Sequence, residues 1–219
     1  MTWAVHIPDG VLSPVALGLG LVLLLLLLAV GCYRLRDDEV AKTGVFTAIL
    51  FVASLIHPPI PGTKVHLILN GLAGMLLGKR VGLAVVIALA LQALLLSHGG
   101  LYALGVNCAT IGLPGLLVAL VFALIKRSVH LQSRLSRLLA GGFLGGLGLV
   151  STLILYYLVL RFGAVSGEDL QLLATIAFVW HIPVIIIEVI FTALVFDFLY
   201  RIKPELLGLQ RSAVRVTGQ

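Results

Sequence analysis

The chain has 219 residues, of which 60% are hydrophobic and only 11% are charged. Roughly half of the residues of a soluble domain are apolar and about a quarter are charged, so this composition excludes an ordinary water-soluble domain and indicates a membrane protein. The net charge of +6 is compatible with a nucleic-acid partner, but no basic run alternates with aromatic residues, so we expect no nucleic acid to bind.

Apolar stretches separated by short polar loops run along the whole chain. Because a helix needs about 20 residues to cross a ~30 Å hydrocarbon core, they predict an all-α, polytopic integral membrane protein with about seven transmembrane helices. Ser13 and Pro14 form a typical N-cap and first-turn pair, which predicts the start of the first span. The predicted segments are 14–35, 43–56, 66–78, 80–97, 108–126, 137–160 and 175–201.

This pattern predicts three regions in the chain. They are an extracytoplasmic N-terminal arm (1–13), a single transmembrane helical domain (14–203) and a cytoplasmic C-terminal tail (204–219). In the 137–160 segment, Gly141 and Gly145, like Gly142 and Gly146, recur at four-residue spacing. Small residues at this spacing predict close packing against another helix.

Positive charge alternates between the predicted loops. Only Lys64 and Arg161 lie on one side, so the positive-inside rule predicts an N-terminus outside, a C-terminus in the cytoplasm, and a multi-pass protein of the cell inner (plasma) membrane. The other thirteen of the fifteen basic residues lie on the opposite side: Arg34, Arg36, Lys42, Lys79, Arg80, Lys126, Arg127, Arg134, Arg137, Arg201, Lys203, Arg211 and Arg215.

The same topology gathers histidines on the outer face. A single membrane histidine is usually a hydrogen-bonded helix contact, but five on one face favour a metal site. Imidazole suits first-row transition metals such as cobalt, nickel, copper and zinc. The outer histidines are His6, His57, His66, His98 and His181, and only His130 is predicted to be cytoplasmic.

Two predicted outer loops contain candidate site residues. The segment from His57 to His66 is stiffened by prolines, and it either holds His66 in place or is a rigid connector. The second loop, 97–107, contains His98, glycines that permit close backbone approach and Asn107, which can donate to a group in an outer site. A simple re-entrant connector explains its composition equally well.

The last predicted span has a polar face. His181, Glu188 and Thr192 are seven and four residues apart, so they share one side of a helix. A carboxylate inside the membrane indicates a functional site, but Glu188 is equally explained as a structural partner of a polar group on another helix.

Several motifs together resemble the CbiM/NikM family, the substrate-binding membrane subunits of energy-coupling-factor cobalt and nickel transporters. The resemblance covers most of the chain. It is carried by the N-terminal HIPDGVLSP (6–14), by PGT (61–63) followed by His66, by GGL and ALG with Asn107 in the 99–107 loop, and by the closing helix from His181 through KPELL (203–207).

The resemblance implies a planar nitrogen site for Co²⁺ or Ni²⁺. It would be formed by the terminal amine, by the backbone nitrogen and imidazole of the second residue, and by another imidazole. Carried over, His6 and His66 supply the imidazoles, and His57 and His98 are further candidate ligands. Asn107, together with His181 and Glu188, would support them.

The resemblance also implies a function and partners. The chain would be a non-catalytic subunit that captures the metal and contributes to supplying cobalamin biosynthesis, with no cofactor beyond the transported Co²⁺ or Ni²⁺. It would assemble with a transmembrane coupling subunit, cytoplasmic ATPase subunits and a small accessory membrane subunit. The segment Gly74 to Arg80 is not a Walker motif, because its glycine spacing is wrong and no Ser or Thr follows Lys79.

The N-terminus departs from the family pattern. Family members usually begin Met-His-Ile-Pro, whereas Met1 to Val5 precede His6 here, which displaces the terminal amine by four residues. Our hypothesis is that Val5 is the initiator and becomes the N-terminal metal ligand.

Two other functions remain open on the residues alone. A proton-coupled secondary metal transporter would place several ionisable residues near the membrane midplane, where Glu188 is nearly alone. An intramembrane metalloenzyme is a further alternative, but the sequence contains neither an HExxH nor a GxSxG motif.

Overall fold

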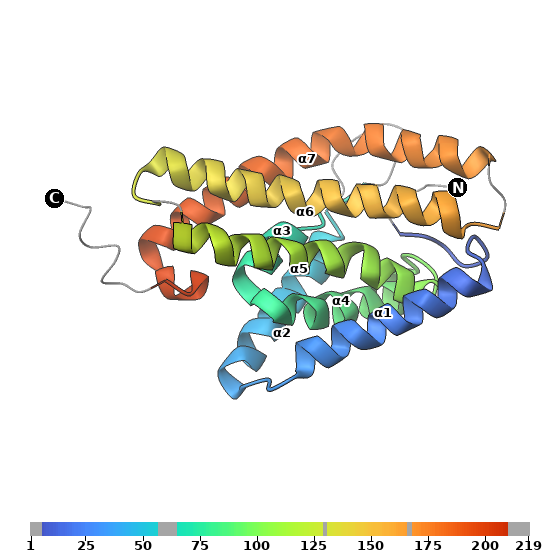
Figure 1. Cartoon of the computed structure of the whole chain (residues 1–219), viewed down its shortest axis with the longest axis horizontal. Helices are drawn as coiled ribbons and strands as arrows, with labels where there is room; N and C mark the ends of the chain where they lie inside the picture. The colour runs from blue at the N-terminus through green and yellow to red at the C-terminus, as the bar shows by residue number, and fades with distance from the viewer. Residues whose placement is uncertain (1–5, 57–64, 129–130, 166–167, 210–219) are drawn as a thin grey trace.

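The computed structural model describes residues 6–56, 65–128, 131–165 and 168–209. These residues fold into helices, and no strand ladder occurs among them beyond one isolated bridge between Leu12 and Ala164 (Figure 1). The helices are α1 (Pro14–Cys32), α2 (Asp37–Ala53), α3 (Asn70–Leu77), α4 (Val81–Leu96), α5 (Leu104–Ser128), α6 (Arg134–Gly163) and α7 (Glu168–Ile202), with short 3₁₀ helices η1 (Gly78–Arg80) and η2 (Pro204–Leu207).

Five helical stretches among the described residues are long and apolar enough to cross a membrane. This confirms an all-helical chain with several candidate spans, while the seven spans of the sequence analysis remain a prediction. The difference arises at α2, which does not qualify, and at α3 and α4, which join into one stretch. The stretches are Pro14–Cys32, Asn70–Leu96, Leu104–Lys126, Arg134–Gly163 and Phe178–Ile202.

The stretch Asn70–Leu96 reverses direction at η1. The contacts of Asn70 show that it lies about halfway along the bundle: its Nδ2 donates to the Ile111 carbonyl of α5 and to Thr152 Oγ1 of α6. Arg80, ten residues later, lies at the end of α1, where its guanidinium donates to the Gly31 carbonyl over 2.8 Å. The chain therefore descends through α3 to one end of the bundle and returns through α4.

The predicted helix 66–78 is wrong over its first four residues, since α3 begins only at Asn70. Leu69 adopts a left-handed conformation with φ +54°. The backbone N–H groups of Ile68 and Leu69 both donate to Glu188 Oε1 of α7, the latter over 3.1 Å. A non-helical segment at this depth is tolerated because the carboxylate satisfies donors that water would otherwise satisfy.

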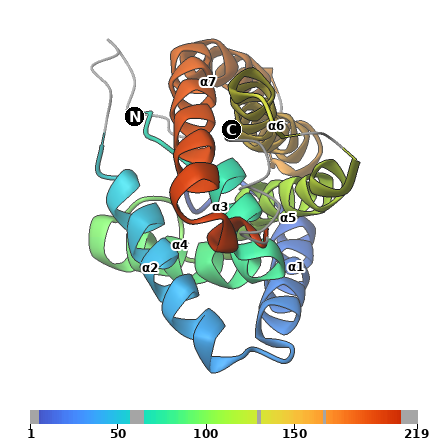
Figure 2. The ribbon, with the colours of Figure 1, turned by 90° about the vertical axis from the view of Figure 1, so that its left-hand side faces the viewer.

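Helix α3 is the central element of the bundle. All eight of its residues are buried, and Figure 2 shows it surrounded by the other helices. Helices α6 and α7 lie side by side along their length in both views. A Cβ on Gly145 would lie 2.7 Å from Thr192 Cβ, and one on Gly141 would lie 2.8 Å from Phe196 Cβ. The predicted close packing at these glycines is confirmed.

The start of α1 agrees with the prediction, whereas several other helices begin earlier than predicted. Ser13 Oγ accepts from the Ala16 N–H at 3.3 Å, which confirms the predicted N-cap of α1. Helix α2 begins at Asp37 rather than 43, because the acidic residues predicted as loop form its first turn, where carboxylates are favoured. Helices α5, α6 and α7 begin at Leu104, Arg134 and Glu168, several residues before their predicted starts.

The described start of the predicted C-terminal tail packs onto the bundle. In η2, Leu207 is buried, and the Leu206 carbonyl accepts from Lys42 Nζ of α2 at 2.8 Å.

Candidate metal centre

Three histidines from distant parts of the sequence meet at one end of the bundle. Nε2 of His6 lies 3.0 Å from Nε2 of His66, and the two ring centroids are 5.0 Å apart. The His98 ring lies 6.4 Å from that of His6 and 6.2 Å from that of His66, with all three rings nearly parallel. His6 and His66 are buried, whereas His98 is half-buried.

The contact between His6 and His66 assigns their protons. Nδ1 of His66 lies 2.9 Å from the carbonyl of Leu67, and because a carbonyl only accepts, this nitrogen carries the proton. In the neutral ring, Nε2 of His66 then presents a lone pair toward His6. His6 donates from Nε2, and its Nδ1 is a buried lone pair that has no hydrogen-bond partner among the described residues. Nδ1 of His6 can therefore bind a metal ion directly, whereas Nε2 of His66 becomes available to an ion when it no longer accepts from His6.

The charge state of His6 also suits metal binding. Burial, followed by the neighbouring His66, His98 and His181, lowers the pKa of His6 well below its usual value of 6.5. The imidazole is therefore neutral at pH 7, which is the form that binds a metal ion.

The N-terminal arm is held in place by Asn107 of α5. The Ile7 N–H donates to Asn107 Oδ1 at 2.8 Å, and Asn107 Nδ2 donates to the Ile7 carbonyl at 2.9 Å. The Gly100 N–H donates to the same carbonyl at 3.1 Å. These hydrogen bonds fix the backbone of Ile7. Because Ile7 follows His6 directly, they also anchor the backbone of His6.

Asp9 ties the same arm to the loop before α5. Its two carboxylate oxygens accept from the Leu101 and Ala103 N–H groups, each at 2.9 Å. The close approach depends on glycine, because a side chain at Gly100 would overlap Asp9, and Gly99 has φ +79°. No role was predicted for Asp9 from the sequence, although its place inside the HIPDG motif is a signal that could have identified it.

The polar face of α7 lies beneath the histidines. His181, Glu188 and Thr192 are all buried, as their predicted common face requires. Glu188 holds the segment that follows His66, which gives it a structural role. Its Oε2 has no hydrogen-bond partner among the described side chains and backbone.

Not every predicted site residue can be placed. Val5 and His57, and with them the proline-rich segment 57–64, lie outside the described residues. Within the described residues, no group of three or more His, Cys, Asp or Glu side chains lies close enough to hold a metal ion. The described part of the site is thus an imidazole pair and a third imidazole, whose ring centroid lies 6.4 Å from that of His6 and 6.2 Å from that of His66.

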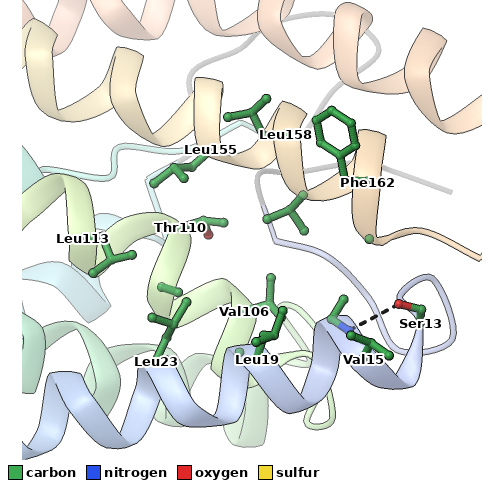
Figure 3. A pocket seen from close by; sticks show the side chains of 15 residues that line it. Ser13, Val15, Leu19, Leu23, Val106, Thr110, Leu113, Leu155, Leu158 and Phe162 are labelled. Carbon is green, nitrogen blue, oxygen red and sulfur yellow. Dashed lines mark hydrogen bonds between the residues drawn. The ribbon is translucent and has the colours of Figure 1, made fainter.

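A large apolar cavity lies away from the histidine site. About 390 Å³ in volume, it lies between α1, α5 and α6 and is almost entirely apolar, with Ser13 and Thr110 as its polar side chains (Figure 3). No histidine lines it. This cavity therefore lacks metal-binding groups.

A helical bundle with several stretches long and apolar enough to cross a membrane defines the class of polytopic helical membrane proteins. The family model described as the cobalt uptake substrate-specific transmembrane region, CbiM, matches residues 6–206. The chain therefore belongs to the CbiM family, and it is a membrane component for metal uptake.

Individual proteins agree with this assignment. A Haemophilus influenzae protein named as a metal transport protein is 35% identical over 205 residues, covering 93% of this chain and 97% of the relative. An Archaeoglobus fulgidus protein named as a fused nickel transport protein, NikMN, is 29% identical, covering 93% of this chain and 68% of the relative. A crystal structure described as a truncated transition metal transporter superposes with a TM-score of 0.66 at 25% identity, covering 90% of this chain and 98% of that one.

Proposed function

We propose that this chain captures Co²⁺ or Ni²⁺ at the extracytoplasmic face of the cell membrane as the substrate-binding subunit of an ATP-driven importer. The observation that carries the proposal is the buried contact between His6 and His66, since imidazole is a preferred ligand of both ions. Cobalt in the family description and nickel in a relative's name support this choice of ions.

The proposed orientation rests on the two ends of the bundle. At the end opposite the histidines, Arg80 contacts the end of α1, Arg137 pairs with Asp197 over 2.6 Å, and Lys42 contacts η2. Basic residues prefer the cytoplasmic side. This distribution supports a site that faces outward, with the C-terminus inside.

The proposed ligand set combines the imidazole pair with the chain terminus. Nδ1 of His6 is the ring nitrogen close enough to its own backbone nitrogen for both to bind one ion, and it is the nitrogen left without a partner. Together with the backbone nitrogen of His6, Nε2 of His66 and a terminal amine, Nδ1 of His6 would complete a planar set of four nitrogens, a geometry typical of Ni²⁺. His57 and His98 are further candidate ligands.

Supporting residues hold this ligand set in position. Asn107 anchors the backbone beside His6, Glu188 anchors the backbone after His66, and His181 lies close enough to act on the charge of His6. Such outer partners typically contribute about 10–100-fold to metal affinity.

The terminal amine requires a chain that starts at residue 5. We propose that translation begins at Val5, which is consistent with a family match that begins at residue 6. The natively expressed protein should then have the intact mass of a chain starting with methionine in place of Val5. A terminus at Met1 or Thr2 would contradict this and leave a site of side chains alone.

ATP hydrolysis would come from partner subunits. A transmembrane coupling subunit, cytoplasmic ATPases and a small accessory membrane subunit form the proposed assembly, in which motion of this subunit delivers the ion inward.

Uptake of radioactive cobalt or nickel tests the proposal. Cells that express this chain with its coupling and ATPase subunits should accumulate the ion, and cells carrying an ATPase without its catalytic glutamate should not. Uptake that persists without any ATPase would contradict the proposal and favour a proton-coupled secondary transporter.

A further inference from the structure

A small cavity adjoins the imidazole pair within the bundle. Its volume is about 10 Å³, which is close to the space that one water molecule needs. His6, His66 and Gln92 are its polar lining residues, contributed by the arm, by the segment before α3 and by α4. The other lining residues are apolar: Leu50, Leu67, Ile68, Val85, Leu89 and Ile111.

Gln92 brings an unsatisfied oxygen to this cavity. The side chain is only 3% exposed, and its Nε2 donates weakly to the Leu50 carbonyl at 3.5 Å. Because that carbonyl can only accept, the amide nitrogen must face it, and the oxygen lies on the other side of the amide group. Oε1 has no partner among the described residues. A buried oxygen left in this state is destabilising unless a ligand or water satisfies it.

The end of α4 positions Gln92 together with His98. The Gln92 carbonyl accepts from the N–H groups of Ser97 and His98, the latter over 3.2 Å. Ser97 closes the helix in a left-handed conformation with φ +53°. Gln92 is thus fixed by the helix end that also brings His98 to the imidazole pair, and it lies on a rigid element.

We propose that Gln92 Oε1 is an oxygen ligand of the transported ion and favours cobalt over nickel. The inference rests on the proposed function, because it needs an ion bound by His6 and His66. A planar set of four nitrogens leaves the positions above and below the plane open. Ni²⁺ is stable in a planar nitrogen set without further ligands, whereas Co²⁺ readily forms five- and six-coordinate complexes that combine nitrogen and oxygen donors. Removing this oxygen should therefore weaken Co²⁺ binding more than Ni²⁺ binding.

Equilibrium titration of the purified full chain with Co²⁺ alone and with Ni²⁺ alone tests this inference. Gln92→Leu should lower Co²⁺ affinity about 10-fold or more, within the range known for such contacts, and change Ni²⁺ affinity about threefold at most. The visible absorption of bound Co²⁺ should become that of a site with one ligand fewer. Gln92→Glu keeps an oxygen at the position and should retain both the Co²⁺ affinity and the absorption.

Gln132→Leu is the matched control. It makes the same chemical change at an exposed position in the turn between α5 and α6, and it should change the affinity for neither Co²⁺ nor Ni²⁺. If Gln92→Leu lowered the affinities for Co²⁺ and Ni²⁺ equally, or left the visible absorption of bound Co²⁺ unchanged, the inference would be overturned while the proposed function remained intact. If the wild-type chain binds neither ion, the proposed function itself fails.

Discussion

His6→Ala and His66→Ala should each lower the affinity for Co²⁺ and Ni²⁺ by more than about 100-fold, exceeding the loss typical of residues outside the ligand set. The two rings are in contact through their Nε2 atoms, so removing either one leaves the other without its partner. His98→Ala should cost about 10-fold or less, because its ring lies more than 6 Å from both. Titration of the three purified variants measures these differences.

His130→Ala serves as the control for these histidine variants. The charge pattern predicts His130 on the cytoplasmic side, so its replacement should leave metal affinity unchanged. Wild-type affinity in both His6→Ala and His66→Ala would contradict the proposed ligand set. A larger loss in His98→Ala than in His66→Ala would exchange the roles of these two residues.

Glu188→Ala should destabilise the protein and weaken metal binding together. The carboxylate accepts two backbone N–H groups of the segment that follows His66. Leaving a buried donor unsatisfied costs about 1–3 kcal/mol per group, and the released segment would no longer hold His66. We expect a lower melting temperature and a loss of about 10–100-fold in Co²⁺ affinity, measured on the same purified samples.

Two variants separate this role from a general effect of substitution in α7. Glu188→Gln keeps an oxygen acceptor and should preserve most of the stability and affinity. Thr192→Val removes a buried hydroxyl on the same helical face that makes no hydrogen bond to any described residue, so it should change neither property. The assigned role would be wrong if Glu188→Ala melted and bound metal like the wild-type chain.

The polar face of α7 shows which features could be predicted from the sequence and which required the structure. Spacing alone predicted that His181, Glu188 and Thr192 share one face, and their burial agrees with this. The choice between a structural and a functional Glu188 required its partners, which lie 119 and 120 residues earlier in the chain. No local pattern contains that information, because it depends on where α7 packs against the segment before α3.

The sequence by itself determined the membrane class, the approximate helices, the close packing at Gly141 and Gly145, and the set of histidines from which the site is built. These features follow from composition, apolar run length and residue spacing, which are local properties. Residue spacing did not pair His6 with His66, which only the family resemblance implied and the tertiary structure shows in contact. Tertiary structure alone decided that residues 65–69 are not helical and that Gln92 lines the same cavity. Each of these depends on which distant backbone and side-chain groups satisfy one another once the helices have packed.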